Sequence, residues 1–165
     1  MLGSLEMDSN EILRAAQELN IPNFLGVFAA DQIGSIKSNH LGTLIVNTEP
    51  SHLDGQHWIS LCICDKDIYL YDPLCLDFHM SKYIRILLIR MNRHFNFNSM
   101  KVQTNDSVKC GYHALVFCYV MSKGKDKNRF RSFLKSFQPY NVSKREQLSL
   151  NYYTIFKENE SKSIV

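Results

Sequence analysis

The order of hydrophobic and polar residues predicts helices at both ends of the chain and strands in its middle. Residues 9–19 repeat apolar side chains at helical intervals, and Asp8 with Glu11 can form a capping pair at the start of this helix. Pro22 ends the pattern, and the stretch after it is predicted to be irregular.

The centre of the chain predicts a β-hairpin beside a shorter strand. Residues 42–47 contain an apolar run typical of a buried strand. Residues 57–64 are apolar on both faces, apart from the first residue and one serine, as expected for a central strand covered on both sides. A polar turn at 65–67 leads into a return strand at 68–72, which Pro73 ends because proline cannot donate to a ladder.

The second half of the chain predicts mostly helices. We expect a helix over 81–93, a strand over 100–103, a helix that begins at Cys110, a basic helix over 126–137 and a last helix over 143–156. The polar tail from Lys157 is expected to fray.

This pattern favours an α+β fold, with a small central mixed or antiparallel sheet flanked by helices. The 165 residues suit a single domain over residues 1–157, followed by a polar tail over residues 158–165. Hydrophobic residues make up 45% of the chain and charged residues 21%, so disorder is not indicated. No apolar run reaches the roughly 18 residues that cross a bilayer, and we expect no membrane contact.

Cysteine usage bears on both compartment and chemistry. The count of five is odd and no signal peptide is seen at the N-terminus, so we expect reduced thiols in a protein that is not secreted. Cys110 alone starts a predicted helix, after a polar loop that can leave it exposed, and the helix dipole lowers the pKa of a thiol there. Gly111 would let a substrate carbonyl approach the backbone. Cys62, Cys64 and Cys118 fall within apolar elements and are expected to be buried. Cys75 stays unassigned.

A base, an acid and an amide stand at the edges of neighbouring elements. His57 starts one strand of the hairpin and Asp72 ends the other, so the carboxylate can accept the Nδ1 proton of the imidazole. Gln103 ends a predicted strand seven residues before Cys110 and can direct its amide NH₂ toward an oxyanion. Taken singly, His57 fits a structural histidine and Asp72 a turn cap; together the four side chains indicate nucleophilic catalysis.

The residues His57-Trp58, Tyr71-Asp72-Pro73, Gln103 and Cys110-Gly111 closely resemble the adenovirus-type maturation proteases (adenain, peptidase family C5). They resemble more distantly the SUMO- and ubiquitin-like-protein proteases of the same clan. The likeness covers nearly the whole chain, and flanking segments favour the viral branch: Asn23-Phe24-Leu25-Gly26, Ile45-Val46-Asn47-Thr48, Gly55-Gln56, Ser132-Phe133-Leu134 and Pro139-Tyr140.

The resemblance implies a papain-like, adenain-like cysteine protease fold with the nucleophile at a helix N-terminus. It implies Cys110 as nucleophile, His57 as base, Asp72 as orienting acid and Gln103 as oxyanion donor. Trp58 would pack near the site and, with Gly111, contact substrate. It further implies a thiol endopeptidase that cuts viral capsid and core precursor proteins after small residues at Gly-containing motifs. Such an enzyme would act in the virion and in the host-cell nucleus or cytoplasm.

Two departures from the family pattern concern activation. In adenain, a capsid-derived peptide is tethered by a disulfide to a cysteine upstream of the oxyanion glutamine, and no cysteine lies between Leu76 and Gln103 here. The connection between the nucleophile helix and the Ser132-Phe133-Leu134 segment is also shorter. We expect a monomer without a cofactor, and a peptide or DNA activator is left open.

Other functions fit the sequence less well. An isopeptidase that removes a ubiquitin-like or SUMO-like modifier would use the same four catalytic positions. A non-enzymatic capsid or DNA-binding component would not need all four intact. His52, His57, Cys62 and Cys64 could be written as a zinc set, but no second CxxC pair accompanies them, so no metal site is predicted.

Positive charge is concentrated in one segment. Between Lys123 and Lys135, six basic residues stand against one acidic residue, a net charge of +5, whereas the whole chain carries +3. A solvated helix face explains this pattern, and so does a surface that binds DNA phosphates, which the resemblance also implies. The residues assigned to that surface are Lys123, Lys125, Lys127, Arg129 and Arg131.

Overall fold

The computed structural model describes residues 6–55, 57–76 and 81–163. Its centre is a five-stranded sheet in the order β1-β2-β3-β4-β5. The strands are β1 (Phe24–Phe28), β2 (Gly42–Asn47), β3 (Trp58–Ile63), β4 (Asp67–Tyr71) and β5 (His94–Phe97). The outer strands β1 and β5 pair in parallel with their neighbours, and β2, β3 and β4 are antiparallel. The predicted α+β class with a mixed sheet is confirmed.

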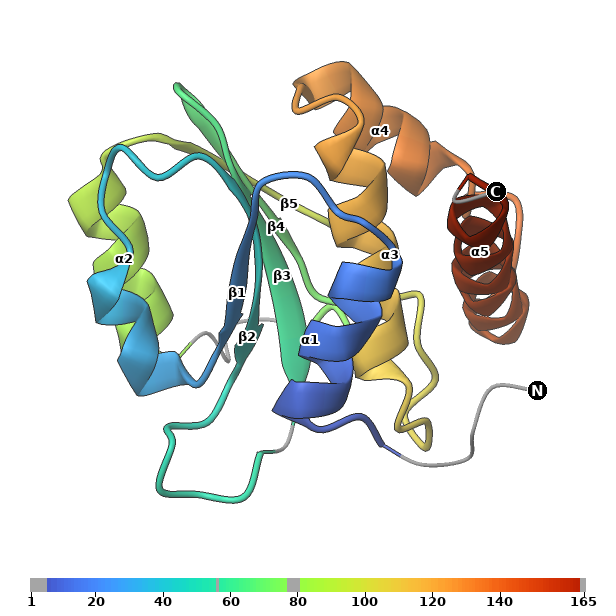
Figure 1. Ribbon diagram of the computed structural model, residues 1–165, viewed down its shortest axis with the longest axis horizontal. Coiled ribbons are helices and arrows are strands. Elements are labelled where there is room, and N and C mark those ends of the chain that lie inside the picture. The colour runs from blue at the N-terminus through green and yellow to red at the C-terminus, as the bar shows by residue number, and fades with distance from the viewer. Residues whose placement is uncertain (1–5, 56, 77–80, 164–165) are drawn as a thin grey trace.

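Helices cover both faces of this sheet (Figure 1). The helix α2 (Lys82–Met91) and the 3-10 helix η1 (Ala30–Ser35) lie on one face. On the other face lie α1 (Ser9–Glu18) and α3 (Cys110–Ser122), with α4 (Lys127–Lys135) and α5 (Val142–Lys162) beyond them. The predicted capping pair of α1 is present, since the Glu11 N–H donates to Asp8 Oδ1 over 2.8 Å and the Asp8 N–H donates to Glu11 Oε2 over 2.9 Å.

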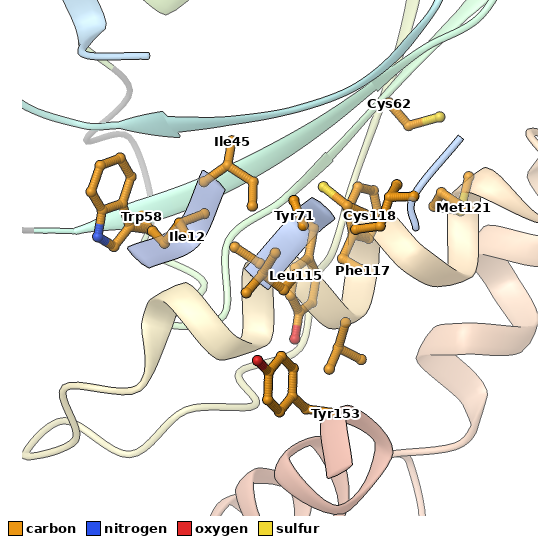
Figure 2. Packing of buried hydrophobic residues seen from close by; sticks show 14 of the residues in the cluster. Ile12, Ile45, Trp58, Cys62, Tyr71, Leu115, Phe117, Cys118, Met121 and Tyr153 are labelled. Carbon is orange, nitrogen blue, oxygen red and sulfur yellow. The ribbon is translucent and has the colours of Figure 1, made fainter. Parts of the chain in front are cut away.

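Strand alternation divides the core into two clusters. On the α2 side, Leu61 and Ile68 are fully buried among the aliphatic side chains of α2 and η1. On the other side, Tyr71 stacks on Phe117 of α3 with ring centroids 5.2 Å apart, within the larger cluster that Figure 2 shows in part. Because α3 lies between the sheet and α5, it carries buried apolar side chains on more than one face.

Residues 24–28 and 100–103 differ from the prediction. Residues 24–28, predicted irregular, form β1, where half-burial of every side chain hides the alternation that marks a strand. The strand predicted at 100–103 is wrong, and β5 lies at 94–97 instead. Val102 is buried and extends toward Pro73, whose carbonyl accepts from its N–H over 2.8 Å, but residues 100–103 join no ladder.

The C-terminal helix is longer than predicted. Residues beyond Lys157, expected to fray, continue α5 to Lys162. Contacts with two other helices stabilise these turns. Lys157 pairs with Glu18 of α1 at 2.8 Å, and Glu160 accepts from the Tyr119 hydroxyl of α3 over 2.8 Å.

Candidate active site

The β3–β4 hairpin brings the predicted base and acid together. Ser60 is paired with Tyr71, so the residues that precede β3 and follow β4 lie at the same end of the hairpin. His57 Nε2 lies 2.6 Å from Asp72 Oδ1, with the imidazole almost fully buried. The predicted pairing is present, but it uses Nε2 rather than the predicted Nδ1. A carboxylate only accepts, so Nε2 carries the hydrogen and Nδ1 remains for a second partner.

Asp72 also caps the turn that follows it. Its Oδ1 accepts from the Leu74 N–H over 2.9 Å, and its Oδ2 accepts from the Leu76 N–H over 3.1 Å. The two interpretations offered by the sequence therefore hold at once, because the carboxylate caps the turn and pairs with His57. These bonds fix the direction of the carboxylate before any substrate is present.

Asn98 holds the backbone of Asp72. It was not among the site residues predicted from the sequence. Its Oδ1 accepts from the Asp72 N–H over 2.8 Å, and its Nδ2 donates to the Asp72 carbonyl over 2.6 Å and to the Met100 carbonyl over 3.1 Å. Asn98 is 6% exposed. In the sequence it is one of several asparagines around β5, and only its place beside β4 distinguishes it.

Cys110 is the first residue of α3, as predicted. The residue before it, Lys109, is the N-cap and makes no side-chain capping bond to the helix. The expected exposure of the thiol is wrong, since Cys110 is 3% exposed and lies in the larger core cluster. A Cβ on Gly111 would lie 3.1 Å from Met7 Cβ, so the glycine admits the segment before α1, which helps to bury the site.

Both neighbours of His57 shift the pKa of its imidazole. Burial alone would lower this pKa, but hydrogen bonds to the Asp72 carboxylate and the Cys110 thiol, with their charges, raise it to about 9. The imidazole is thus a stronger proton acceptor than a free histidine. The thiol, the imidazole and the carboxylate form one connected set.

Gln103 lies in the loop before α3. Its side chain is 1% exposed, and Nε2 donates to the Ser107 carbonyl over 2.6 Å. An amide NH₂ carries two hydrogens, so one remains for another acceptor. The Gln103 N–H donates to the Pro73 carbonyl over 2.9 Å, which joins this loop to the turn that contains Asp72.

Glu146 of α5 anchors the same loop from behind. It accepts from the Thr104 N–H over 3.4 Å and from the Thr104 hydroxyl over 3.1 Å, and it lies 3.7 Å from His113 Nε2 of α3. Burial would raise its pKa, but His113, Ser107 and Thr104 lower it to about 2. His113 itself is buried, which lowers its pKa, and its Nδ1 bonds to the Ser149 hydroxyl at 2.7 Å.

A cavity of about 480 Å³ opens beside Trp58, between the segment before α1 and the residues around the end of β2. Trp58 is 6% exposed, and its Nε1 donates to the Met7 carbonyl over 2.9 Å. Gly55 also lines the cavity, where a Cβ would lie 2.3 Å from Asn47 Nδ2 and force that side chain to move. Trp58 directly follows His57 in the chain, but none of the four predicted catalytic residues lines the cavity.

The predicted DNA surface lies on and before α4. Phe130 and Phe133 bury the inner face of this helix, and the basic side chains point away from the core. Lys123 Nζ lies 3.5 Å from Glu160 and over the Tyr119 ring, 4.6 Å from its centroid. Lys125 is half-buried. The remaining members are exposed: Lys127, Arg129 and Arg131.

No disulfide joins any of the five cysteines; Cys62 and Cys118 are buried as predicted, whereas the predicted burial of Cys64 is wrong, since it is half-buried. Cys62 Sγ lies 3.8 Å from Cys64 Sγ. Across residues 6–55, 57–76 and 81–163, no three His, Cys, Asp or Glu side chains are grouped as metal ligands would be. Within those residues, none of the helices has the length and apolarity required to span a bilayer.

A thiol at a helix start, beside a histidine that a carboxylate orients, is the arrangement of the cysteine proteases. The chain belongs to the adenovirus endoprotease family, whose model matches residues 24–164. The predicted family and enzyme class are thereby confirmed.

Curated relatives agree with this assignment. The chain is 26% identical to a protease of Porcine adenovirus A serotype 3 over 76% of its own length and 67% of the relative's. It is 27% identical to a protease of Ovine adenovirus D serotype 7, over 81% and 73% of the two chains. A protease of Snake adenovirus serotype 1 is 30% identical over 72% and 65%. The chain thus spans between 65% and 73% of the length of these relatives.

Proposed function

We propose that this chain is a cysteine endopeptidase that cleaves viral capsid and core precursor proteins at Gly-containing sites. The observation that carries the proposal is the 2.6 Å contact between His57 Nε2 and Asp72, beside the thiol of Cys110 at the start of α3. Membership of the adenovirus endoprotease family supports the viral substrate class.

In this proposal, His57 accepts the Cys110 proton at Nδ1 while Nε2–H stays bonded to Asp72. The thiolate sulfur attacks the scissile carbonyl carbon, and the carbonyl π electrons move onto its oxygen. The Cys110 backbone N–H and the free Gln103 amide hydrogen stabilise that oxyanion. When it collapses, the C–N bond breaks and His57 gives its proton to the leaving amine. Water, deprotonated by His57, then hydrolyses the thioester and restores the thiol.

The cavity beside Trp58 is the proposed approach for the peptide. Cys110 is 3% exposed, and we place the incoming peptide in the cavity because Trp58, the residue after His57, lies in its wall. Gly55 lines this cavity, and a Cβ there would meet the Asn47 side chain, so a larger residue would obstruct it.

Mapping of cleavage sites tests the proposal. The protein is incubated with the capsid and core precursors of the virus that encodes it, and new termini are identified by mass spectrometry. Cleavage after glycine that Cys110→Ala abolishes is the expected result. Intact precursors, together with covalent labelling by a ubiquitin-like protein that ends in a Gly-Gly aldehyde, would indicate an isopeptidase instead. If the precursors stay intact and the ubiquitin-like probe does not label the protein, the proposed protease role is overturned.

Place and regulation of activity follow the same proposal. Capsid precursors are encountered in the assembling virion and in the host-cell nucleus or cytoplasm, so activity is proposed there. A disulfide-tethered peptide activator does not fit, since the segment from residue 77 to residue 102 contains no cysteine. DNA remains a candidate activator through the exposed cations of α4.

A further inference from the structure

The side chain of Asn98 takes the place of the next residue pair between β4 and β5. These strands pair in parallel from Asp67 with His94 to Leu70 with Phe97, and the pairing ends there. Asn98 is one residue beyond Phe97, and its amide bonds to both the N–H and the carbonyl of Asp72, two residues beyond Leu70. A side chain thus holds the backbone on both sides of the Asp72 Cα, as a ladder partner would.

We propose that Asn98 is a positioning residue for catalysis, which acts on His57 through Asp72. The inference rests on the proposed protease function. Rotation of the Asp72 backbone would swing its carboxylate away from Nε2, and the following Pro73 has no N–H to oppose this rotation. Asn98 opposes it with two bonds, of 2.8 and 2.6 Å, at the residue that orients the base.

The position of Asn98 makes this role specific. Its third bond, from Nδ2 to the Met100 carbonyl over 3.1 Å, fixes the amide plane, so Oδ1 and Nδ2 cannot exchange places without losing all three bonds. At 6% exposure the amide is shielded from water, which therefore replaces a lost bond poorly. A small movement of a catalytic group costs up to about 10²-fold in rate.

Asn96 supplies a matched control on the same strand. Its Nδ2 donates to Asp67 Oδ1 over 3.2 Å, at the far end of the same β4–β5 pair. Asn96→Ala therefore removes an asparagine side chain that joins β5 to β4 without touching Asp72. A general weakening of the β5 edge affects both variants, whereas loss of Asp72 positioning affects only Asn98→Ala.

The test is steady-state kinetics of purified, folded Asn98→Ala and Asn96→Ala on a cleaved precursor peptide. We expect kcat to fall about 10- to 100-fold in Asn98→Ala, with KM within about twofold, and Asn96→Ala to match wild type. The pKa of His57, read from the pH dependence of iodoacetamide inactivation, should also fall toward its ordinary value in Asn98→Ala alone. If Asn98→Ala does not fold, Asn98→Ser replaces it, since one hydroxyl cannot bridge both backbone groups.

A double-mutant comparison separates this inference from the proposed function. If Asn98 acts through Asp72, Asn98→Ala should cost less than about threefold in an Asp72→Ala background. An undiminished loss in that background, a loss confined to KM, or an unchanged His57 pKa would each overturn the positioning role. An Asp72→Ala protein with full activity would instead overturn the proposed role of the His57–Asp72 pair.

Discussion

The two halves of the candidate site are held in different ways. His57 and Asp72 stand at the end of a hydrogen-bonded hairpin, and Asn98 prolongs the sheet around them. Gln103 lies in a loop without a ladder, held by the Ser107 and Pro73 carbonyls and, from behind, by Glu146 of α5. The proposed proton-transfer half therefore depends on the sheet. The proposed oxyanion half depends on two loop carbonyls and on one side chain of α5.

The largest expected effect comes from the residue at which the halves meet. Cys110→Ala should abolish cleavage, because the thiolate supplies the covalent step, and should leave the fold intact. Residual activity above about a per cent of wild type would mean that the nucleophile is misassigned. Cys64→Ala is the control, since Cys64 is a half-buried thiol outside the site. Although Cys110 is only 3% exposed, iodoacetamide should modify it before the other thiols, because His57 beside it can accept its proton; peptide mapping would locate the adduct.

The proton-transfer half should respond unequally to loss of its two members. His57→Ala should cost several orders of magnitude in kcat, because no other described base adjoins the thiol. Asp72→Asn should cost less, because the amide oxygen can still accept from Nε2–H and keep the ring oriented. Turnover of one peptide substrate by both variants ranks them. Equal losses would show that the charge of Asp72, rather than its direction, is what matters.

The oxyanion half should show a smaller loss without a change in affinity. Gln103→Ala should lower kcat by about 10²- to 10³-fold, the scale of one oxyanion donor, with KM almost unchanged. An unchanged kcat would leave stabilisation of the oxyanion to backbone N–H groups. Glu146→Gln keeps the shape of the anchor and removes its charge, so a milder fall in kcat is expected there.

The same contrast should appear in stability against pH. The folded pKa of His57, about 9, exceeds the ordinary 6.5, so its stabilising effect is complete below pH 6.5 and is lost as pH rises through 9. The pKa of Glu146, about 2, lies below the ordinary 4.5, so its effect is present above pH 4.5 and is lost as pH falls through 2. Thermal unfolding from pH 2 to pH 10 measures both.

Two variants test which residue pair causes the loss of stability at high pH and which causes the loss at low pH. The Tm deficit of Asp72→Asn relative to wild type should shrink between pH 6.5 and 9. That of Glu146→Gln should shrink between pH 4.5 and 2. Deficits that stay constant across those ranges would mean that neither pKa shift is coupled to folding.

The smallest effect on catalysis is expected from the basic surface. Duplex DNA should bind with an affinity that falls by several log units per log unit of salt, because phosphate contacts release counterions. Charge reversal at Lys127, Arg129 and Arg131, which are exposed, should flatten this slope and leave peptide cleavage unchanged. Lys144→Glu, on the exposed start of α5, is a matched control. Absence of DNA binding at about 50 mM salt would leave α4 as an ordinary surface helix.

Local sequence patterns were sufficient to single out three of the residues proposed to carry the chemistry. His57, Asp72 and Cys110 each stand at the edge of an element that hydrophobic alternation or helical spacing marks clearly. Asn98 and Glu146 were missed because their roles arise only when β5 pairs in parallel with β4 and when α5 packs behind α3. The choice between Nδ1 and Nε2 of His57 was missed for the same reason, since the ring orientation depends on tertiary contacts.

The position of Trp58 has a practical consequence for following the enzyme in solution. It is the chain's only tryptophan, and its indole lies at the wall of the cavity with its N–H tied to the Met7 carbonyl. Excited at the red edge of its absorption, where tyrosine is silent, it gives a fluorescence signal from one known place. A peptide that enters the cavity, or a shift of the segment before α1, would change that emission. Binding can thus be timed in a stopped-flow instrument with Cys110→Ala protein, without an added dye and without turnover.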